Sequence, residues 1–403
     1  MTSLPSKRFG RPAFRFNELA LVGAIVAVVL LTTLLDTNHS YWNDPTTSIR
    51  NIARNTSMLG IFSLGAAVVI IAGGIDLSSG SMIAFSGTVC ATFMLLLAPD
   101  EMKSGEPLNL TVIAVSIAGT LIVGLLIGTL HTWLIAIVRL PPFIATLGTL
   151  VGLRSLARLI CGEVNGGSSQ IQLFDDRFRY LGQNVWISVL VFAVLALLVW
   201  LLLSRTVIGR HLYALGGNEE AARLSGIRTE RIKWLAYCIG SVTASIAGIL
   251  YIGQLGTAEP DKLCVGYELY AIAAAVVGGC SLSGGIGTVP GTVLGVLFLQ
   301  EVIDAVAKVI HKQSQLYEGT VLGLVLICAS VFSRFREMAG HKKQLFPGLL
   351  GWLSIVSIAM FSGLVLMMMW NRWGGVASAA AVFVALAIVK FLEVRRMPAG
   401  APQ

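Results

Sequence analysis

The sequence predicts an all-α fold: a polytopic helical membrane protein with broken, glycine-rich spans. Of its 403 residues, 55% are hydrophobic and only 12% are charged, whereas a soluble domain carries about 25% charged residues. Apolar runs close to bilayer-spanning length recur along the chain, and the mean hydropathy is +0.80. Basic residues gather at the ends of these runs, so the formal charge of +8 orients the chain in a membrane and does not indicate nucleic-acid binding.

The apolar runs predict about ten spans in a core, followed by two more at the C-terminus. The first run, Leu19–Leu35, is interpreted as a retained span, because no small-x-small signal-peptide cleavage site follows it. A polar, amphipathic segment at 44–55 is expected to lie at the outer surface, and Pro141-Pro142 marks a break. The later spans are predicted at 58–72, 82–98, 110–138, 143–160, 185–203, 234–252, 267–277, 289–310, 321–332, 345–370 and 376–391.

Four basic clusters indicate the orientation. They lie in the N-terminal tail, at 204–233, at 334–343 and in the C-terminal tail, with even numbers of predicted spans between them. All four therefore fall on one side, which is predicted to be the cytoplasm, together with both termini. Two domains are predicted. Residues 1–335 form a transmembrane domain with a cytoplasmic loop at 204–233, and residues 336–403 form a two-helix membrane extension with a basic tail.

The stretch Ala72–Ser81, AGGIDLSSGS, interrupts a long apolar region with glycines, hydroxyls and one carboxylate. Irregular backbone cannot face lipid, because its N–H and C=O groups would lack partners, so it must lie against protein or a water-filled path. An ionisable residue at this depth, Asp76, is a candidate functional group. It is also a candidate cap for the next helix, through the amide of Ser78 or Ser79. The two roles are compatible, since broken helices in transporters place their ends at substrate sites.

This stretch has an echo later in the chain. GGIDLSSG at 73–80 and GGCSLSGG at 278–285 share Gly-Gly, Leu-Ser and the final Gly in register. Such short, glycine-interrupted spans predict a duplicated transporter fold with its site at the repeat interface, although glycine is also a common packing residue in membrane helices. The span count gives both copies the same orientation, unless the short segment 267–277 is re-entrant. The predicted substrate pathway comprises Gly73, Gly74, Asp76, Ser78, Ser79, Ser81, Gly278, Gly279, Ser281 and Ser283.

A polar stretch in the basic loop predicts a short, capped helix. Asn218 is a suitable N-cap, two acids follow in the first turn, and Gly226 stands at a C-cap position. Such a helix lying across the inner face is suited to insert into a groove of a partner; the alternative is an ordinary connecting helix. The residues predicted to couple the chain to that partner are Gly217, Asn218, Glu219, Glu220, Ala221, Ala222, Arg223 and Gly226.

Several enzymatic chemistries have no motif here. The chain contains no GxxxxGK[ST] phosphate loop and no Gly-Lys dipeptide, so it cannot hydrolyse ATP by that route. It contains no HExxH, GxSxG or paired His/Cys ligands, so no metal or other cofactor is expected, and His131 and His211 are isolated. Proton-coupled transport usually relies on several buried ionisable residues. Here Asp76 stands almost alone in the core, with Glu268, Glu301 and Asp304 as weaker candidates for such residues, which argues against a proton-coupled pump.

Four motifs together resemble a known family. They are GGIDLSSGS at 73–81, LPPFIATLGTL at 140–150, GRHLYALGGNEEAARLSGI at 209–227 and GGCSLSGGIGTVPGT at 278–292. In this order and spacing, the chain resembles the permease subunits of bacterial ABC importers for monosaccharides of the ribose, xylose and galactose type, over roughly residues 45–335. Two features depart from that pattern: the second glycine-rich motif lacks an acid, and the two helices after Arg336 are additional.

The resemblance implies a non-enzymatic transport subunit in the lipid of the bacterial inner membrane. Its partners are then a cytoplasmic ABC ATPase subunit that uses the ATP, a periplasmic sugar-binding protein, and a second permease subunit in a homodimer or heterodimer. The loop 209–227 is then expected to meet the ATPase. The alternative is a self-contained secondary carrier or channel for a small polar solute, with that loop as a mere connector; an intramembrane enzyme ranks third.

Overall fold

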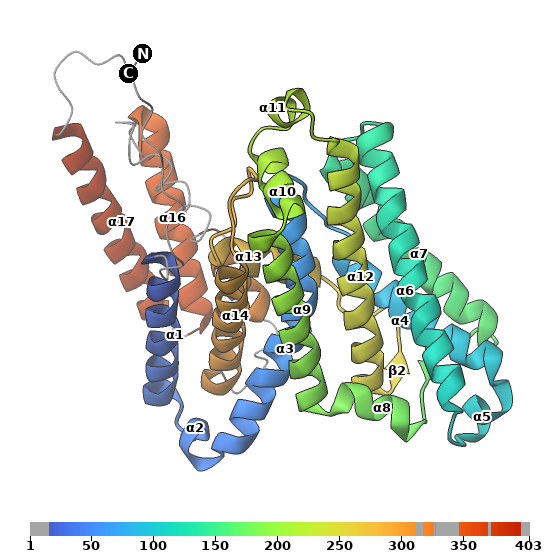
Figure 1. Ribbon diagram of the computed structural model, residues 1–403. Helices are drawn as coiled ribbons and strands as arrows, with labels where there is room; N and C mark the ends of the chain where they lie inside the picture. Colours follow the sequence, from blue (N-terminus) through green and yellow to red (C-terminus); the bar gives the residue numbers. More distant parts are fainter. Residues whose placement is uncertain (1–15, 311–316, 326, 328–345, 370–371, 396–403) are drawn as a thin grey trace. The chain divides into compact units, whose positions relative to one another are not determined.

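A computed structural model of the protein describes residues 16–310, 317–325, 327, 346–369 and 372–395 (Figure 1). The chain divides into two compact units, Met1–Ser333 and Arg334–Gln403. Among the described residues, ten helices are long and apolar enough to cross a membrane. The only sheet in this part is the antiparallel pairing of β1 (Ile171–Gln172) with β2 (Thr257–Ala258). The predicted all-α, polytopic fold is confirmed.

The helices of the first unit follow the predicted order closely. They are α1 (Phe16–Leu35), α2 (Ser40–Asn43), α3 (Pro45–Ile71), α4 (Ser79–Leu97), α5 (Pro99–Ser104), α6 (Leu110–Thr132), the π-helix η1 (Trp133–Ile137), α7 (Pro142–Val164), α8 (Asp176–Gln183), α9 (Val185–Arg205), α10 (Val207–Gly217), α11 (Glu219–Leu224), α12 (Thr229–Leu255), α13 (Tyr267–Val277) and α14 (Val289–Val309).

Three predicted elements differ from, or extend beyond, the described structure. The polar segment 44–55 is not a separate surface element, because Asp44 caps a helix that continues through the apolar run as the 27-residue α3. The Asp44 side chain accepts the Thr47 N–H at 3.2 Å, and Pro45 occupies the first turn. Segment 267–277 is the helix α13, whose 11 residues are too few to span a bilayer. Half of the predicted span 321–332 lies outside the described residues, and its described part, 321–325 and 327, is helical; the basic N-terminal tail and the segment 334–343 also lie outside.

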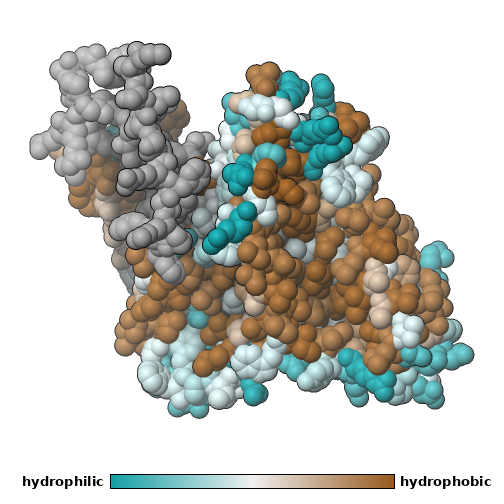
Figure 2. Space-filling view, viewed as in Figure 1, coloured by the Kyte–Doolittle hydropathy of each residue, from teal (hydrophilic) through white to brown (hydrophobic). Residues whose placement is uncertain are grey.

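Helices α3, α4 and α12 form the interior of the first unit. Their apolar windows are 89%, 83% and 72% buried, whereas those of α6, α7 and α9 are each 22% buried. Figure 2 shows apolar side chains over the middle of this unit and hydrophilic residues towards its two ends. The outer helices therefore present their apolar faces to lipid, and the three interior helices are free to carry polar groups.

Helix α12 packs against α3, α4, α6 and α8 through small residues. A Cβ added at Gly128 of α6 would collide with the Cys238 backbone, and one at Gly248 would collide with the Ile83 carbonyl of α4. Apolar helices gain little from the hydrophobic effect in lipid, so close backbone approach and dispersion hold them together. Small residues on α12 allow that approach on several sides at once.

The second unit contains a helical hairpin of α16 (Gly348–Met369) and α17 (Arg372–Arg395), which pack together along their length. Lys390 is buried, and its ammonium donates to the carbonyl oxygens of Phe346 at 3.2 Å and Gly348 at 2.6 Å. The Lys390 ammonium is thereby hydrogen-bonded to two carbonyls at the start of α16, which ties the end of α17 to that segment. Both helices have membrane-spanning length. A separate role for residues 336–403 stays a prediction.

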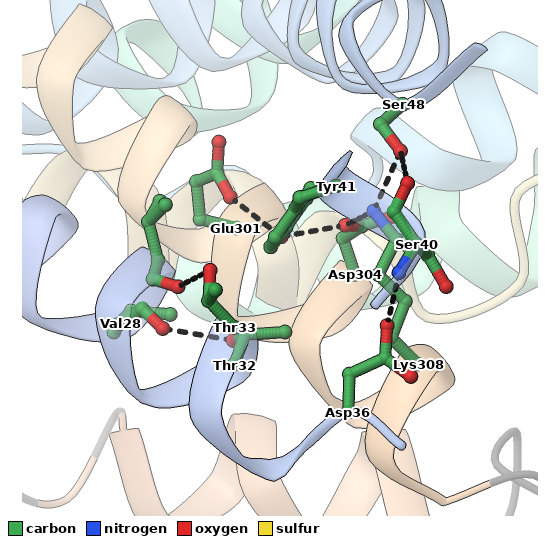
Figure 3. Close-up of polar contacts among 11 residues, drawn as sticks. Val28, Thr32, Thr33, Asp36, Ser40, Tyr41, Ser48, Glu301, Asp304 and Lys308 are labelled. Carbon is green, nitrogen blue, oxygen red and sulfur yellow. Dashed lines mark hydrogen bonds and ion pairs between the residues drawn. The ribbon is translucent and has the colours of Figure 1, made fainter. Parts of the chain in front are cut away.

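A partly buried polar cluster joins α2 and α3 to α14 (Figure 3). The Tyr41 hydroxyl donates to Asp304 at 2.9 Å and to Glu301 at 3.3 Å. Burial, and then the Asp304 carboxylate, raise the pKa of Tyr41 above its ordinary value, so the hydroxyl keeps its proton. The Lys308 ammonium donates to Asp304 at 2.6 Å and to Ser48 at 3.2 Å, and it lies 3.6 Å from the Tyr41 ring centroid. One cation therefore balances two neighbouring acids.

We expect Lys308→Met to destabilise the protein by about 3 kcal/mol, because it leaves two carboxylates together without their cation. The measurement is thermal unfolding of the full chain in lipid nanodiscs. Lys103→Met is the matched control, since Lys103 lies exposed on α5. Equal unfolding temperatures for the two variants would show that the cluster adds nothing to stability.

Candidate functional site

Asp76 holds the turn that leads from the central break into the next helix. Helix α3 ends at Ile71, and Gly73 adopts φ +82°, the left-handed conformation typical of a glycine after a helix. The buried Asp76 carboxylate accepts the Ser78 N–H at 2.8 Å and the Ser78 hydroxyl at 2.6 Å. Helix α4 begins at the next residue. The predicted bond between the Asp76 carboxylate and the Ser78 amide is present, but it forms a turn before α4: the N-cap of α4 is Ser78, which has no side-chain cap hydrogen bond.

The Asp76 site includes a histidine that the sequence left isolated. The Nε2 atom of His131 lies 3.4 Å from the Ser78 hydroxyl and 2.8 Å from the Thr149 hydroxyl. His131 is fully buried, and its ring centroid lies 6.0 Å from that of Tyr237. The geometry is not that of a catalytic triad, because the serine donates to the aspartate and the Nδ1 atom of His131 has no partner among the described residues.

The second glycine-rich motif repeats the first with a one-residue offset. Gly279 adopts φ +94° after α13, where Gly73 does so after α3. The helix-ending glycines are therefore the first of the pair in one copy and the second in the other. The polar turn keeps the sequence register, since Ser281 accepts the Ser283 N–H at 3.3 Å as Asp76 accepts that of Ser78. The loop after it is longer, and Thr288 rather than Ser281 caps α14.

Both motifs meet at one point, which we call the glycine junction (Gly73, Gly216, Gly284 and Gly285). The Gly285 N–H donates to the Ile71 carbonyl oxygen at 2.9 Å. A Cβ on Gly216 would collide with that same carbonyl, and a Cβ on Gly284 would lie 2.8 Å from the Gly73 Cα. The C-terminal end of α10 is thus wedged between the two helix breaks.

The junction also decides the orientation of the two copies. Helices α3 and α13 pack together and both end near it, and α14 begins beside the end of α13, where Gly291 lies against Gly278. The rings of Phe62 and Tyr267 lie 6.4 Å apart, each about ten residues before the end of its helix. The two copies therefore run in the same direction. Only in the first copy is the helix before the break, α3, long enough to span the membrane.

A cavity of about 530 Å³ opens beside the junction. Its wall combines residues from the four motifs that carried the family resemblance. They are Gly73, Gly74 and Ser283 from the glycine-rich motifs, Pro141 and Pro142 from the proline break, and Gly216, Glu219 and Arg223 from the polar loop, with Tyr237 and Lys233 from α12. Asp76 and Ser78 lie behind this wall, in the buried network.

The polar loop contains the predicted short helix, α11. The Asn218 side chain accepts the Ala221 N–H at 2.9 Å, and Gly226 adopts φ +84° where the Ile227 N–H returns to the Ala222 carbonyl at 3.1 Å. These contacts confirm both predicted caps, and the helix ends at residue 224.

The surface of α11 is almost entirely open. Ala222 is its one buried residue, and Gly217 before it is also exposed. Glu219 pairs with Lys233 of α12 at 2.6 Å. The Glu220 carboxylate bonds Arg223 at 2.8 Å and raises its pKa. These ion pairs orient a protruding helix (Figure 1) without covering it.

Arg154 connects the central motif to the opposite end of the molecule. Its guanidinium donates to the Ser81 hydroxyl at 3.2 Å and to the carbonyls of Pro260 and Leu263 at 2.6 and 3.0 Å. Arg154 thus reaches the loop between α12 and α13. Arg158, one turn on, is half-exposed and pairs with Asp261. An arginine inside an apolar span was the sequence signal for this contact.

Two further residues of the predicted substrate pathway, Ser79 and Gly278, lie outside the cavity wall. The Ser79 hydroxyl is buried, with no hydrogen-bond partner in the described part of the chain. A Cβ on Gly278 would collide with the Gly291 carbonyl of α14, so this glycine permits close packing. The ten predicted pathway residues thus divide into four groups: Gly73, Gly74 and Ser283 line the cavity, Asp76, Ser78, Ser79 and Ser81 are buried, Gly278 packs against α14, and Gly279 and Ser281 form the second helix break.

We expect Gly216→Ala to destabilise the chain by about 1–3 kcal/mol, since its Cβ has no space beside the Ile71 carbonyl. Gly217→Ala is the matched control, because a Cβ at Gly217 meets nothing within 4 Å. Thermal unfolding of both full-length variants in nanodiscs makes the comparison. The close packing at the junction is refuted if the two substitutions have the same effect.

Comparison with known proteins identifies the family. Residues 48–330 match the family model described as "Branched-chain amino acid transport system / permease component". The chain is 34% identical to the ribose import permease protein of Escherichia coli K12, over 74% of this chain and 88% of that protein. It is 35% identical to the galactose/methyl galactoside import permease protein of the same strain, over 68% and 82%.

A third relative is the autoinducer 2 import system permease protein of Photorhabdus luminescens, 30% identical over 77% of this chain and 88% of that protein. No solved structure matches the chain significantly. The match covers both glycine-rich motifs, the proline break and α11, which are the segments that meet around the cavity and the junction. The chain therefore belongs to this family of multi-pass permease components of membrane transport systems.

Proposed function

We propose that the chain is the permease subunit of an ATP-driven ABC importer that moves a pentose or hexose across the bacterial inner membrane. The relatives named for ribose and galactose import support the substrate class. One observation supports the mechanism above all: the two helix breaks and the end of α10 touch at the glycine junction. A movement delivered to the polar loop therefore reaches both breaks at once.

In this mechanism the energy comes from a separate cytoplasmic ATPase subunit, which binds the ATP; this chain binds no metal or other cofactor. The short α11 fits a groove on that subunit, and Leu224, which is 81% exposed, supplies an apolar anchor. Closure of the ATPase displaces α11 and, through the directly preceding α10, the Gly216 wedge. The two breaks then shift, and the pathway opens alternately to the outer and inner sides.

A periplasmic sugar-binding protein delivers the substrate, and a second permease subunit, identical or related, completes the pore. Both chain termini then lie in the cytoplasm. A self-contained secondary carrier or channel is the competing proposal, and it needs neither ATPase nor binding protein. The first experiment is a gentle pull-down of the full chain from its native membrane, with partners identified by mass. Recovery of a stoichiometric subunit with a Walker A loop supports the importer, whereas uptake by the chain alone, driven by membrane potential, supports the carrier.

We expect Leu224→Ser to reduce the recovery of the ATPase subunit about tenfold, the equivalent of 1.4 kcal/mol, with no change in unfolding temperature. The matched control is Ile49→Ser. It alters an apolar residue that is 64% exposed near the start of α3, the end of that helix remote from the glycine junction. Unchanged recovery with Leu224→Ser, together with binding of no ATPase to a peptide of residues 209–231, would remove α11 from the coupling mechanism.

Asp76→Asn is expected to weaken sugar uptake about tenfold while leaving the unfolding temperature unchanged. The amide oxygen still accepts the Ser78 N–H, so the turn survives and only the charge is lost. Asp100→Asn, at an exposed acid of α5, is the control in the same cellular uptake assay. Full uptake by a correctly folded Asp76→Asn protein would show that this carboxylate serves only to hold the turn with Ser78.

A further inference from the structure

A second cavity lies at the end of α12 that is remote from the polar loop. It has a volume of about 610 Å³, within the usual range for small-molecule sites. The first cavity is lined by Thr229, Lys233 and Tyr237 near the start of α12, and the second by Tyr251 and Gln254 near its end. The two cavities therefore open near opposite ends of one 27-residue, membrane-spanning helix.

The shortness of α13 creates this second cavity. Its 11 residues rise about 16 Å, which is less than half the length of the 27-residue α3 beside it. Tyr267, at its first turn, lies level with Phe62 in the middle of α3, and both Tyr267 and Asn55 line the cavity. A full-length span in place of α13 would fill this space. The space is instead left open from the C-terminal end of α12 to the level of Tyr267 in the middle of α3. The first turn of α13 borders that space through Tyr267 and Tyr270.

The lining of the second cavity suits a neutral, polyhydroxylated ring. Three tyrosines lie together, with the Tyr267 ring centroid 6.0 Å from that of Tyr251 and 5.3 Å from that of Tyr270. Aromatic faces pack on the apolar C–H faces of a sugar ring. The carboxamides of Gln254 and Gln300 also line the cavity and have no hydrogen-bond partner among the described residues. Each offers two donors and an acceptor to hydroxyl groups.

The charges lining the cavity argue against an amino-acid ligand. Lys262, the only lysine or arginine among the described residues that line the cavity, is 79% exposed and already pairs with Glu259 at 2.9 Å. The half-buried Glu318 remains as an acid. A free carboxylate on the ligand would therefore meet no unpaired cation in this lining, whereas sugar hydroxyls can donate to Glu318.

We propose that this cavity, bounded by the tyrosine cluster of α12 and α13 and the glutamines of α12 and α14, is the site where the monosaccharide first binds the permease. The inference rests on the proposed function and names the site at which its substrate is recognised. It places recognition around Tyr270 and Gln300, separate from Asp76, which lies in the buried network beyond the Arg154 contact.

Arg154 makes this cavity part of the transport machinery. Its guanidinium donates to the carbonyl of Leu263 at 3.0 Å and to that of Cys264 at 3.4 Å, and both residues line the cavity. The same guanidinium bonds Ser81 in the first turn of α4, five residues after Asp76. Arg154 is therefore a positioning residue that links the floor of the sugar site to the central break.

The test is saturation-transfer NMR on the full-length chain in lipid nanodiscs, titrated separately with D-ribose, D-xylose, D-galactose and L-leucine. At least one sugar should receive saturation, strongest at its ring C–H protons. Tyr270→Leu and Gln300→Leu should each raise its dissociation constant about tenfold. The matched controls are Tyr180→Leu and Gln183→Leu, at exposed positions on α8 outside the cavity, and they should leave the constant unchanged. Tyr270→Phe should retain the C–H contacts.

Each other outcome overturns the proposal. Binding that all four leucine variants weaken equally, or not at all, would place the sugar elsewhere. Saturation of L-leucine alone would replace the substrate class. No saturation of any sugar, in a chain that still recovers its ATPase from the native membrane, would refute this binding site while leaving the importer function intact.

Discussion

The fold depends on pairing irregular backbone inside a membrane. Where α3 and α13 stop, their last carbonyls and the following amides have no helical partners, and lipid offers none. The break after α3 uses the Gly285 amide for the Ile71 carbonyl and the Asp76 carboxylate for the Ser78 amide. Such contacts require the chains to approach without a Cβ between them, and glycine alone permits this.

The same requirement connects the two sides of the protein. Towards the polar loop, the Gly216 end of α10 lies against both breaks. Towards the opposite end, Arg154 joins Ser81 after the first break to the loop that precedes α13. The central motif therefore has one contact with the segment that meets the proposed energy source and another with the proposed sugar site. Because packed interiors are close to incompressible, a shift at one contact displaces the other.

The duplication explains why one half carries the charge. In the first copy an aspartate holds the polar turn and starts α4 within a few residues. In the second, Ser281 holds the same turn, and a longer loop leads to a separate cap at Thr288. The helix that leads into the second break, α13, is also short, and the second cavity lies at its N-terminal end. The two copies thus run in one direction but contribute differently, one a buried carboxylate and the other an accessible vestibule.

Features that depend on neighbouring residues followed from the sequence alone. The membrane class, the order of the spans, the Asp76–Ser78 hydrogen bond, and the caps by Asn218 and Gly226 are determined by hydropathy and by hydrogen bonds spanning a few residues. Contacts between distant segments required the tertiary structure. His131 beside Ser78, the bond from Arg154 to Ser81, the Gly216 wedge and the tyrosine cavity join residues tens to more than two hundred positions apart. A sequence reports which side chain can cap a helix, because donor and acceptor are covalent neighbours. Only helix packing decides which distant backbone comes close enough to bond.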